Sequence, residues 1–246
     1  MATLTRFIPL LATSTMLLAC GQQAGVSQDA NAAARATTQA SADHPVVIEL
    51  FQSQGCSSCP PANAALNAVA DRDDLIALNF SVTYWDRLGW KDIFGDKAYT
   101  QRQYDYAGAL RNQNVYTPQM VINGTRAITG NKPGELNRAI AASKPVTGGP
   151  TIKGAERTVA IGSGSGAADI WLIRYDPRIQ NVAIRSGENG GRTLPHKNIV
   201  RQIDRIGEWN GNAASYTLTQ AKNTSWKSVV LVQRQGAGAI ISARKI

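Results

Sequence analysis

Cysteine and histidine are scarce in this chain, and their scarcity argues against a zinc site. The 246 residues include three cysteines and two histidines. A structural zinc site needs four ligands at suitable spacing. Cys56 and Cys59 form a single C-x-x-C pair, while His44 and His196 lie far apart in the sequence. We therefore predict no metal site and no bound cofactor.

A long apolar run is also missing. The apolar stretch Phe7 to Leu18 follows Arg6 and is too short for an ordinary membrane span, so residues 1–19 are predicted to be a signal peptide. The stretch ends in LLACG, which resembles the bacterial lipobox, where cleavage precedes the cysteine and the cysteine takes the lipid. Cys20 is therefore the predicted lipidation site. The alternative is an ordinary secretory signal that happens to contain a cysteine.

The next segment, residues 20–44, has few apolar anchors. It is rich in Ala, Gln, Ser and Thr, and it is predicted to form a disordered tether. Gly21 rather than aspartate follows Cys20, which favours the outer membrane by resemblance to bacterial sorting signals. The expected location is the periplasmic face of the cell envelope, with the chain anchored by lipid.

Two further chemistries lack their sequence signals. Nothing resembles a nucleophile elbow, and neither histidine has a neighbouring acid–nucleophile pattern, which argues against a serine hydrolase. The Gly-rich run 162–166 is not followed by Lys-Ser or Lys-Thr, which argues against a phosphate-binding loop.

The C-x-x-C pair lies between a predicted strand and a predicted helix. Val46 to Phe51 is a short apolar run typical of a buried strand. Two prolines after Cys59 suit a first helical turn. A helix N-terminus stabilises a thiolate, so Cys56 is predicted to be the exposed attacking thiol and Cys59 the shielded resolving thiol. The apolar face of the helix comprises Ala62, Ala65, Leu66 and Val69.

An inert structural disulfide is the alternative, because a C-x-x-C ring can form without being used. If Cys20 is lipidated, however, Cys56 and Cys59 can pair only with each other. An extracytoplasmic protein of this size with one C-x-x-C and no other thiol fits redox chemistry better than stapling.

Leu75 to Thr83 predicts a second strand, joined to the first by the helix and therefore parallel to it. Active groups in such sheets collect at the carboxyl ends of the strands. Tyr84, Trp85 and Asp86 follow this strand, so we predict that the aromatics grip substrate beside the C-x-x-C and that Asp86 modulates the thiols. The alternative is a loop whose aromatic side chains cover the sheet edge.

Thr117 and Pro118 precede another apolar run. Thioredoxin-like proteins place a cis-proline before a strand, facing the C-x-x-C, so the Thr117–Pro118 bond is predicted to be cis and both residues to bind the substrate backbone. A closing helix is predicted over Glu135 to Ser143. This order of elements predicts a thioredoxin-like domain over residues 45–145, with a central mixed sheet flanked by helices.

The pattern changes after residue 145. Residues 146–246 contain short strand-like runs with Gly-rich turns, which predict a small C-terminal β-sandwich-like domain. The predicted fold class is therefore α/β, a thioredoxin-like domain followed by a β-rich domain. Within the second part, the segment 188–192 (ENGGR) is predicted to be a turn held by side-chain hydrogen bonds rather than a ligand site.

Charge divides unevenly between the two parts. Residues 45–145 contain 10 Lys or Arg and 9 Asp or Glu, whereas residues 146–246 contain 14 and 6, which places +8 of the net +9 in the second part. A basic module can bind nucleic acid, anionic headgroups or acidic proteins. Secretion argues against nucleic acid.

Five stretches together resemble one family of secreted bacterial proteins that is thioredoxin-like and labelled as a domain of unknown function: VIELFQSQGCSSCPPAN, YWDRLGWKDIF, VYTPQMVING, GENGGRTLPHKNIVR and GEWNG. The resemblance covers nearly everything after about residue 45. Cys56, Cys59 and Pro118 match motifs of the wider thioredoxin superfamily. The chain lacks the Trp before and the Gly-Pro inside the C-x-x-C of thioredoxin itself, so the redox potential is not predicted.

These observations predict a membrane-tethered, extracytoplasmic thiol–disulfide oxidoreductase. In this prediction Cys56 attacks a substrate disulfide, Cys59 resolves the mixed disulfide, and Thr117-Pro118 orients the substrate. The expected partners are disulfide- or thiol-bearing envelope proteins, not nucleic acid. The alternative is a non-catalytic envelope binding or assembly protein that uses the fold as a scaffold.

Overall fold

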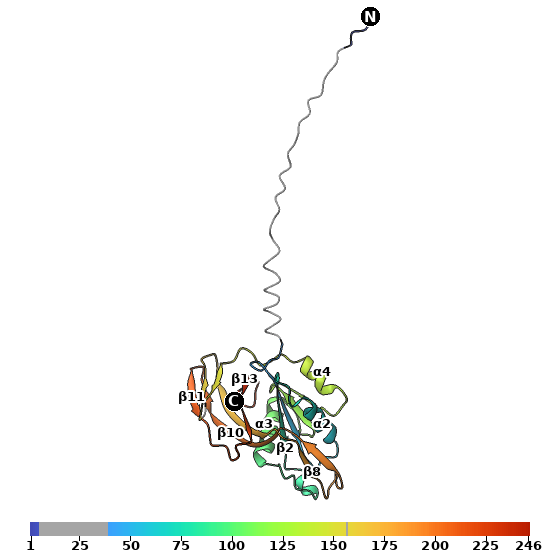
Figure 1. Cartoon of the computed structure of the whole chain (residues 1–246), viewed down its shortest axis with the longest axis vertical. Helices are drawn as coiled ribbons and strands as arrows, with labels where there is room; N and C mark the ends of the chain where they lie inside the picture. Colours follow the sequence, from blue (N-terminus) through green and yellow to red (C-terminus); the bar gives the residue numbers. More distant parts are fainter. Residues whose placement is uncertain (5–38, 156) are drawn as a thin grey trace. The chain divides into compact units, whose positions relative to one another are not determined.

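The computed structural model describes residues 1–4, 39–155 and 157–246. The predicted lipidation site Cys20 and most of the predicted tether therefore lie outside the described residues. No helix within the described stretches is long and apolar enough to cross a membrane. The elements below belong to the unit Thr38–Ile246, drawn in Figure 1.

One sheet of eight strands runs through this unit. Its strands along the chain are β1 (Val46–Gln52), β2 (Leu75–Ser81), β3 (Gln119–Ile122), β4 (Arg126–Ile128), β7 (Ala168–Asp176), β10 (Ile199–Trp209), β12 (Lys227–Arg234) and β13 (Ile240–Lys245). Their order across the sheet is β13-β12-β7-β10-β2-β1-β3-β4. β1 and β2 are parallel neighbours, and β3 runs antiparallel to β1.

Two smaller sheets and a few helices complete the described part. The small sheets contain β5 (Ile152–Gly154), β6 (Thr158–Ile161) and β11 (Ala214–Thr217), and separately β8 (Gln180–Ala183) and β9 (Thr193–His196). The helices are α2 (Pro60–Val69), α3 (Lys97–Ala109), α4 (Glu135–Ala141) and the short 3-10 helix η1 (Asp86–Leu88).

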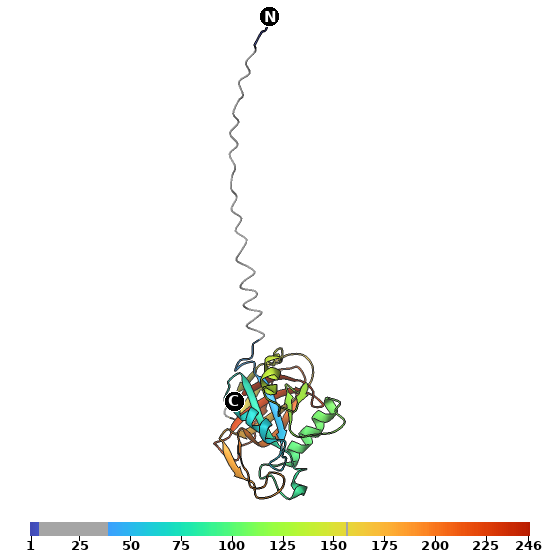
Figure 2. The ribbon, with the colours of Figure 1, turned by 90° about the vertical axis from the view of Figure 1, so that its right-hand side faces the viewer.

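The predicted fold class is wrong. The structure is mostly β and 16% helical, and strands from both sides of residue 146 share the large sheet. β10 pairs in parallel with β2 through Ile199 and Asn79, and the Asn79 N–H donates to the carbonyl oxygen of Asn198 at 3.0 Å. Figures 1 and 2 show blue, cyan, orange and red strands in one body. A helix-flanked thioredoxin-like domain followed by a separate β-sandwich is therefore not what forms.

The physical reason is the open edge of β2. A strand at the edge of a sheet presents unpaired N–H and C=O groups, which a further strand satisfies. β10 occupies that edge, and β7, β12 and β13 follow it outward. Among the described strands after residue 146, β10 joins the first half through β2, and the others pair with one another or with β10.

β1 and β2 are buried along their whole length. Alternate side chains pack on opposite faces of the sheet. On one face Phe51 stacks on Phe80 with ring centroids 5.2 Å apart and meets Tyr106 of α3 edge-on at 6.0 Å. On the other face Leu50 lies in a cluster with Leu66 of α2. Because a helix packs on each face of these strands, the side chains on both faces are mostly apolar.

A charged residue nevertheless lies in the middle of β1. Glu49 is fully buried and accepts hydrogen bonds from Nε and Nη2 of Arg102 at 2.7 and 3.1 Å. The Tyr106 hydroxyl also donates to Glu49. Gln233 of β12 accepts from Arg102 Nη2 at 3.2 Å and donates to the Tyr106 hydroxyl at 3.0 Å. These four residues, the core ion-pair network, tie β1 and α3 to a strand of the second half.

Candidate functional site

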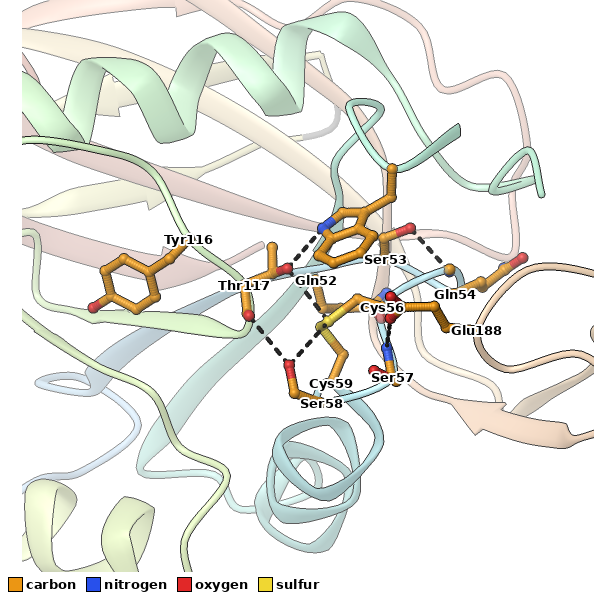
Figure 3. The surroundings of a disulfide bond; sticks show 12 residues. Gln52, Ser53, Gln54, Cys56, Ser57, Ser58, Cys59, Tyr116, Thr117 and Glu188 are labelled. Atoms are coloured by element: carbon orange, nitrogen blue, oxygen red, sulfur yellow. Dashed lines mark hydrogen bonds between the residues drawn. A yellow bond between two sulfur atoms is a disulfide. The ribbon is translucent and has the colours of Figure 1, made fainter. Parts of the chain in front are cut away.

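The C-x-x-C segment joins the end of β1 to the start of α2. Cys56 and Cys59 form a disulfide with their Cα atoms 5.4 Å apart, drawn in Figure 3. Cys59 is the N-cap of α2, with prolines at the first two helical positions. Two tight turns shape the loop, because the Cys56 N–H donates to Ser53 O at 3.1 Å and the Cys59 N–H donates to Cys56 O at 3.2 Å.

Two hydroxyl groups lie against the sulfur of Cys56. Thr117 Oγ1 donates to Cys56 Sγ at 3.3 Å, and Ser58 Oγ lies 3.4 Å from the same sulfur. Ser58 Oγ is also 3.4 Å from the carbonyl oxygen of Thr117, to which it can donate. The Trp85 indole N–H donates to Thr117 Oγ1 at 2.8 Å. Because Thr117 Oγ1 accepts from Trp85, its own proton is free to point at the sulfur. Figure 3 draws the contact between Thr117 and Cys56 as a dashed line.

The structure thus brings together four of the residues that the sequence singled out. Cys56, Cys59, Thr117 and Trp85 form one contact chain, and the Thr117–Pro118 bond is cis as predicted. The predicted exposure of Cys56 is wrong, since it is 0% exposed and Cys59 is 1% exposed. The surface over the disulfide is formed instead by the exposed residues Ser57 and Ser58.

Tyr84 and Asp86 lie in the predicted segment but face other partners. The Tyr84 hydroxyl donates to Gln103 Oε1 of α3 at 3.2 Å, and burial raises the pKa of Tyr84 to about 12. Asp86 begins η1, and its Oδ1 accepts from the backbone N–H of Asp92 at 3.0 Å. In the described part of the chain, neither side chain has a hydrogen bond to a cysteine sulfur.

Asp92 is the carboxylate that supports the C-x-x-C loop. It is 1% exposed, and its Oδ2 accepts from the Gln54 N–H at 2.8 Å while its Oδ1 accepts from the Phe94 N–H at 2.9 Å. Burial raises the pKa of Asp92 to about 6, although these two donors act against that shift. Sequence reasoning missed this residue and named Asp86, six positions earlier in the same aromatic-rich segment, because spacing alone does not show which carboxylate turns inward.

The segment 188–192 forms the predicted turn, with the Arg192 N–H donating to Asn189 O at 3.1 Å and Arg192 Nη1 donating to Asn189 Oδ1 at 2.8 Å. It also does more than the sequence indicated. The fully buried Asn189 donates through Nδ2 to the carbonyl oxygens of Gln54 and Cys56, both at 2.9 Å. Asn and Gly at these positions signal a turn, but no local pattern says that the turn binds a loop more than 130 positions earlier.

Glu188 extends this contact to the outer side of the loop. Its Oε2 accepts from the backbone N–H of Ser57 at 3.1 Å, as Figure 3 shows. Hydrogen bonding from Ser57 lowers the pKa of Glu188 below its ordinary value. A carboxylate therefore occupies one of the amide donors next to Cys56, close to the N-terminus of α2.

The second half of the chain also lines a groove beside the pair. The groove encloses about 320 Å³ between the start of α2 and β9. Asn63 and Asn67 of α2 both donate to the carbonyl oxygen of Pro195, at 2.6 and 2.9 Å. The side chains that line the groove are Pro60, Pro61, Asn63, Ala64, Arg192, Leu194 and Pro195.

His196 lies close to this region and belongs to no metal cluster among the described residues. His196 of β9 is 1% exposed, packs edge-on against Phe94, and has no hydrogen bond to either ring nitrogen. Burial lowers the pKa of His196 to about 4. Over residues 1–4, 39–155 and 157–246, no three His, Cys, Asp or Glu side chains gather as a metal site would require.

Comparison with known proteins places the whole arrangement in one family. No curated protein matches the sequence. The crystal structure of protein AGR_C_4864 from Agrobacterium tumefaciens is 31% identical, with a TM-score of 0.70 over 85% of this chain and 95% of that chain. HBP35 of Porphyromonas gingivalis, at 13% identity, shares the fold with a TM-score of 0.56 over 85% of this chain and 76% of that one. Residues 47–233 match the family described as "Protein of unknown function (DUF1223)", and the chain belongs to this family.

Proposed function

We propose that the protein is a thiol–disulfide oxidoreductase that acts through Cys56 and Cys59. The observation that carries the proposal is the hydrogen bond from Thr117 Oγ1 to Cys56 Sγ. A hydroxyl proton held at the sulfur stabilises a thiolate there, and a stabilised thiolate is both a better leaving group and a more populated nucleophile. A disulfide that only clasps a loop does not require such a donor.

The proposed exchange has two steps. A substrate thiolate attacks Cys56 Sγ, a mixed disulfide forms, and the electron pair of the broken bond leaves on Cys59. A second substrate thiolate then attacks the substrate sulfur of the mixed disulfide, and Cys56 leaves as a thiolate. The substrate dithiol is oxidised by two electrons and the protein disulfide is reduced. The same steps in reverse reduce a substrate disulfide, with Cys56 as the nucleophile.

Cys56 is the exchanging sulfur because of its surroundings. The hydroxyls of Thr117 and Ser58 lie at Cys56 Sγ. Cys59 instead caps α2 and precedes Pro60. Trp85 holds the Thr117 hydroxyl in place, so it acts as a positioning residue and not as a substrate clamp alone.

The proposal includes the cell envelope. Residues 1–20 have the pattern of a lipoprotein signal, and the substrates would be thiol- or disulfide-bearing envelope proteins. Changing Cys20→Ser should release the protein from the membrane fraction into the soluble periplasmic fraction. Unchanged fractionation, with no lipid label on the wild-type chain, would contradict the anchor.

A non-catalytic binding or assembly protein is the second candidate, and one observation favours it. Both cysteines are almost completely buried, as expected of a disulfide that only braces a loop. In this reading the disulfide keeps Ser57 and Ser58 in position at the surface.

Redox equilibrium separates the two candidates. The full chain would be equilibrated with glutathione buffers of graded ratio, and the fraction of Cys56–Cys59 disulfide measured by alkylation and mass spectrometry. We expect a reversible transition within the range of known oxidoreductases, roughly −120 to −270 mV, and catalysis of insulin reduction that Cys56→Ser abolishes. Thr117→Val should slow exchange while leaving the disulfide intact. A disulfide that stays oxidised in all these buffers, together with no insulin reduction, would assign the pair to the clasp.

A further inference from the structure

A second cavity, lined by none of the site residues described above, lies in the second half of the chain. It encloses about 960 Å³ and is lined by β5, β7, β13 and the segment after β11. This volume falls in the range of small-molecule sites. The cavity is therefore large enough for a ligand of its own.

The charged side chains that line this cavity have one sign. Five of the lining residues are basic, and no described lining residue is Asp or Glu. Lys153 and Arg157 lie exposed at its rim on and beside β5. Arg244 pairs with Asp43 at 3.1 Å, and Lys245 donates to the carbonyl oxygen of Arg72 at 3.3 Å. Like charges brought together in a concave site focus a positive potential that favours an anion.

The fifth basic residue, Arg174 of β7, is buried. It is 4% exposed, and its Nη1 donates to Thr219 Oγ1 at 3.0 Å while its Nη2 donates to the Thr219 carbonyl oxygen. Its Nε is buried with no hydrogen-bond partner. Asp204 accepts from Thr219 Oγ1 at 2.8 Å and not from the guanidinium. Burial lowers the pKa of Arg174.

Such an arginine is costly without an anion. A buried donor left without an acceptor destabilises the folded state, and more so if the group is charged. Among the described residues, Arg174 forms no ion pair, unlike Arg102 with Glu49 in the core. Guanidinium groups bind phosphate oxygens through paired N–H donors.

The walls of the cavity add apolar surface to this charge. Ile152, Leu218 and Ile246 are among the lining residues, and Ile152 is buried. Apolar walls with a few polar groups that fix orientation are typical of sites for small organic molecules. A ligand that fills the cavity would place its charge at Arg174 and its apolar part against these side chains.

We propose that this cavity binds a ligand through a phosphate group, with Arg174 at the floor and Lys153 and Arg157 at the rim. A phosphate ester on an apolar body and free inorganic phosphate share this chemistry. The site is independent of the thiol exchange proposed for Cys56.

Calorimetric titration of the full chain tests the proposal with two probes. Dodecyl phosphate, kept below its micelle concentration, has the phosphate group and an apolar body, and inorganic phosphate has the phosphate group alone. We expect saturable binding of dodecyl phosphate at one site per chain. Equal affinity for inorganic phosphate would support the anion site and assign free phosphate as its ligand. No binding of either probe would overturn the proposal.

Three variants assign any binding to the cavity. Arg174→Met should weaken binding by at least about tenfold, the loss of one charge-assisted pair. Because Arg174 is buried, the exposed rim variant Arg157→Glu provides the test that does not depend on core packing, and it too should weaken binding severalfold. Lys132→Glu, an exposed charge reversal next to α4 and outside the cavity, is the matched control. An equal loss in Lys132→Glu, or no loss in Arg157→Glu, would contradict the site.

Discussion

The core ion-pair network and the C-x-x-C loop both join the two halves of the chain, but through opposite kinds of contact. In the core, Gln233 of the second half hydrogen-bonds Arg102 and Tyr106 around the buried ion pair of Glu49 and Arg102. At the loop, the exposed Glu188 and the buried Asn189 of the second half hydrogen-bond backbone groups around Cys56. Buried charges are expensive to leave unpaired, whereas an exposed carboxylate such as Glu188 adjusts chemistry at little cost in stability.

The largest expected effect comes from breaking the core network. Glu49→Gln leaves Arg102 buried with no counter-charge, so we expect the free energy of unfolding to fall by about 3–5 kcal/mol. Urea denaturation measures this loss. The exposed pair between Arg72 and Asp74 is the control, since its side chains are 44% and 28% exposed and Arg72→Ala should cost at most about 1 kcal/mol. Equal losses in the two variants would contradict the expected difference between a buried and an exposed ion pair.

The next effect concerns Asp92 and His196, which both contact Phe94. Asp92 accepts from the Phe94 N–H, and His196 packs edge-on against the Phe94 ring. The pKa of Asp92 is raised to about 6 from about 3.9 in an unfolded chain. Between these values the native state holds more protons, so this carboxyl makes the free energy of unfolding fall as pH rises. The pKa of His196 is lowered to about 4 from about 6.5. In that window the unfolded state holds more protons, so His196 makes stability rise with pH.

The two slopes oppose each other, and single variants should separate them. Relative to wild type, His196→Phe should raise the free energy of unfolding at pH 4.5 by up to about 3 kcal/mol. This gain should disappear as the pH approaches 6.5. Asp92→Asn should show the reverse trend. Urea denaturation from pH 4 to 7 measures both. Parallel pH profiles for the variants and wild type would show that neither group titrates differently on folding.

An intermediate effect is expected at Asn189. Asn189→Ala removes the donor to two carbonyl oxygens of the C-x-x-C loop, which should cost about 1–3 kcal/mol. Because the loop loses its support, the reduced thiol of Cys56 should also alkylate faster. The exposed Asn212→Ala is the control and should change neither quantity. A loss of stability without faster alkylation would place the role of Asn189 in folding alone.

The smallest effect on stability, and the sharpest on chemistry, is expected at Glu188. Its carboxylate occupies the Ser57 N–H and places negative charge near the start of α2. Glu188→Gln should therefore lower the pKa of the Cys56 thiol and make the pair more oxidising, because the thiolate form gains stability. The pH dependence of thiolate absorbance and the glutathione equilibrium measure these changes. The exposed Glu208→Gln is the control, and a pair whose potential is the same in both variants would leave Glu188 without a redox role.

The individual elements were predicted more accurately than their assembly. The strand before Cys56, the helix after Cys59 and the cis bond before Pro118 all form where the sequence placed them. The strand and the helix depend on signals close in the sequence, the apolar period and the prolines at the helix start. The cis bond was expected from the resemblance to thioredoxin-like proteins. The α/β fold class failed because the same strand patterns after residue 146 suit either a separate sandwich or an extension of the first sheet.

The candidate site divides in the same way. Sequence alone determined the C-x-x-C at a helix start, because this follows from a strand–helix order that is written locally. The approach of Thr117, 61 positions later, was expected only from the resemblance to thioredoxin-like proteins. Only the tertiary structure decided that Asp92 rather than Asp86 faces the loop, and that Asn189 binds both sides of Cys56. In the sequence, a carboxylate that turns inward, such as Asp92, cannot be told from an exposed one, and the same holds for a turn asparagine such as Asn189. What distinguishes them is a backbone partner brought close by the shared sheet, and pairing over such distances leaves no periodic signal in the chain.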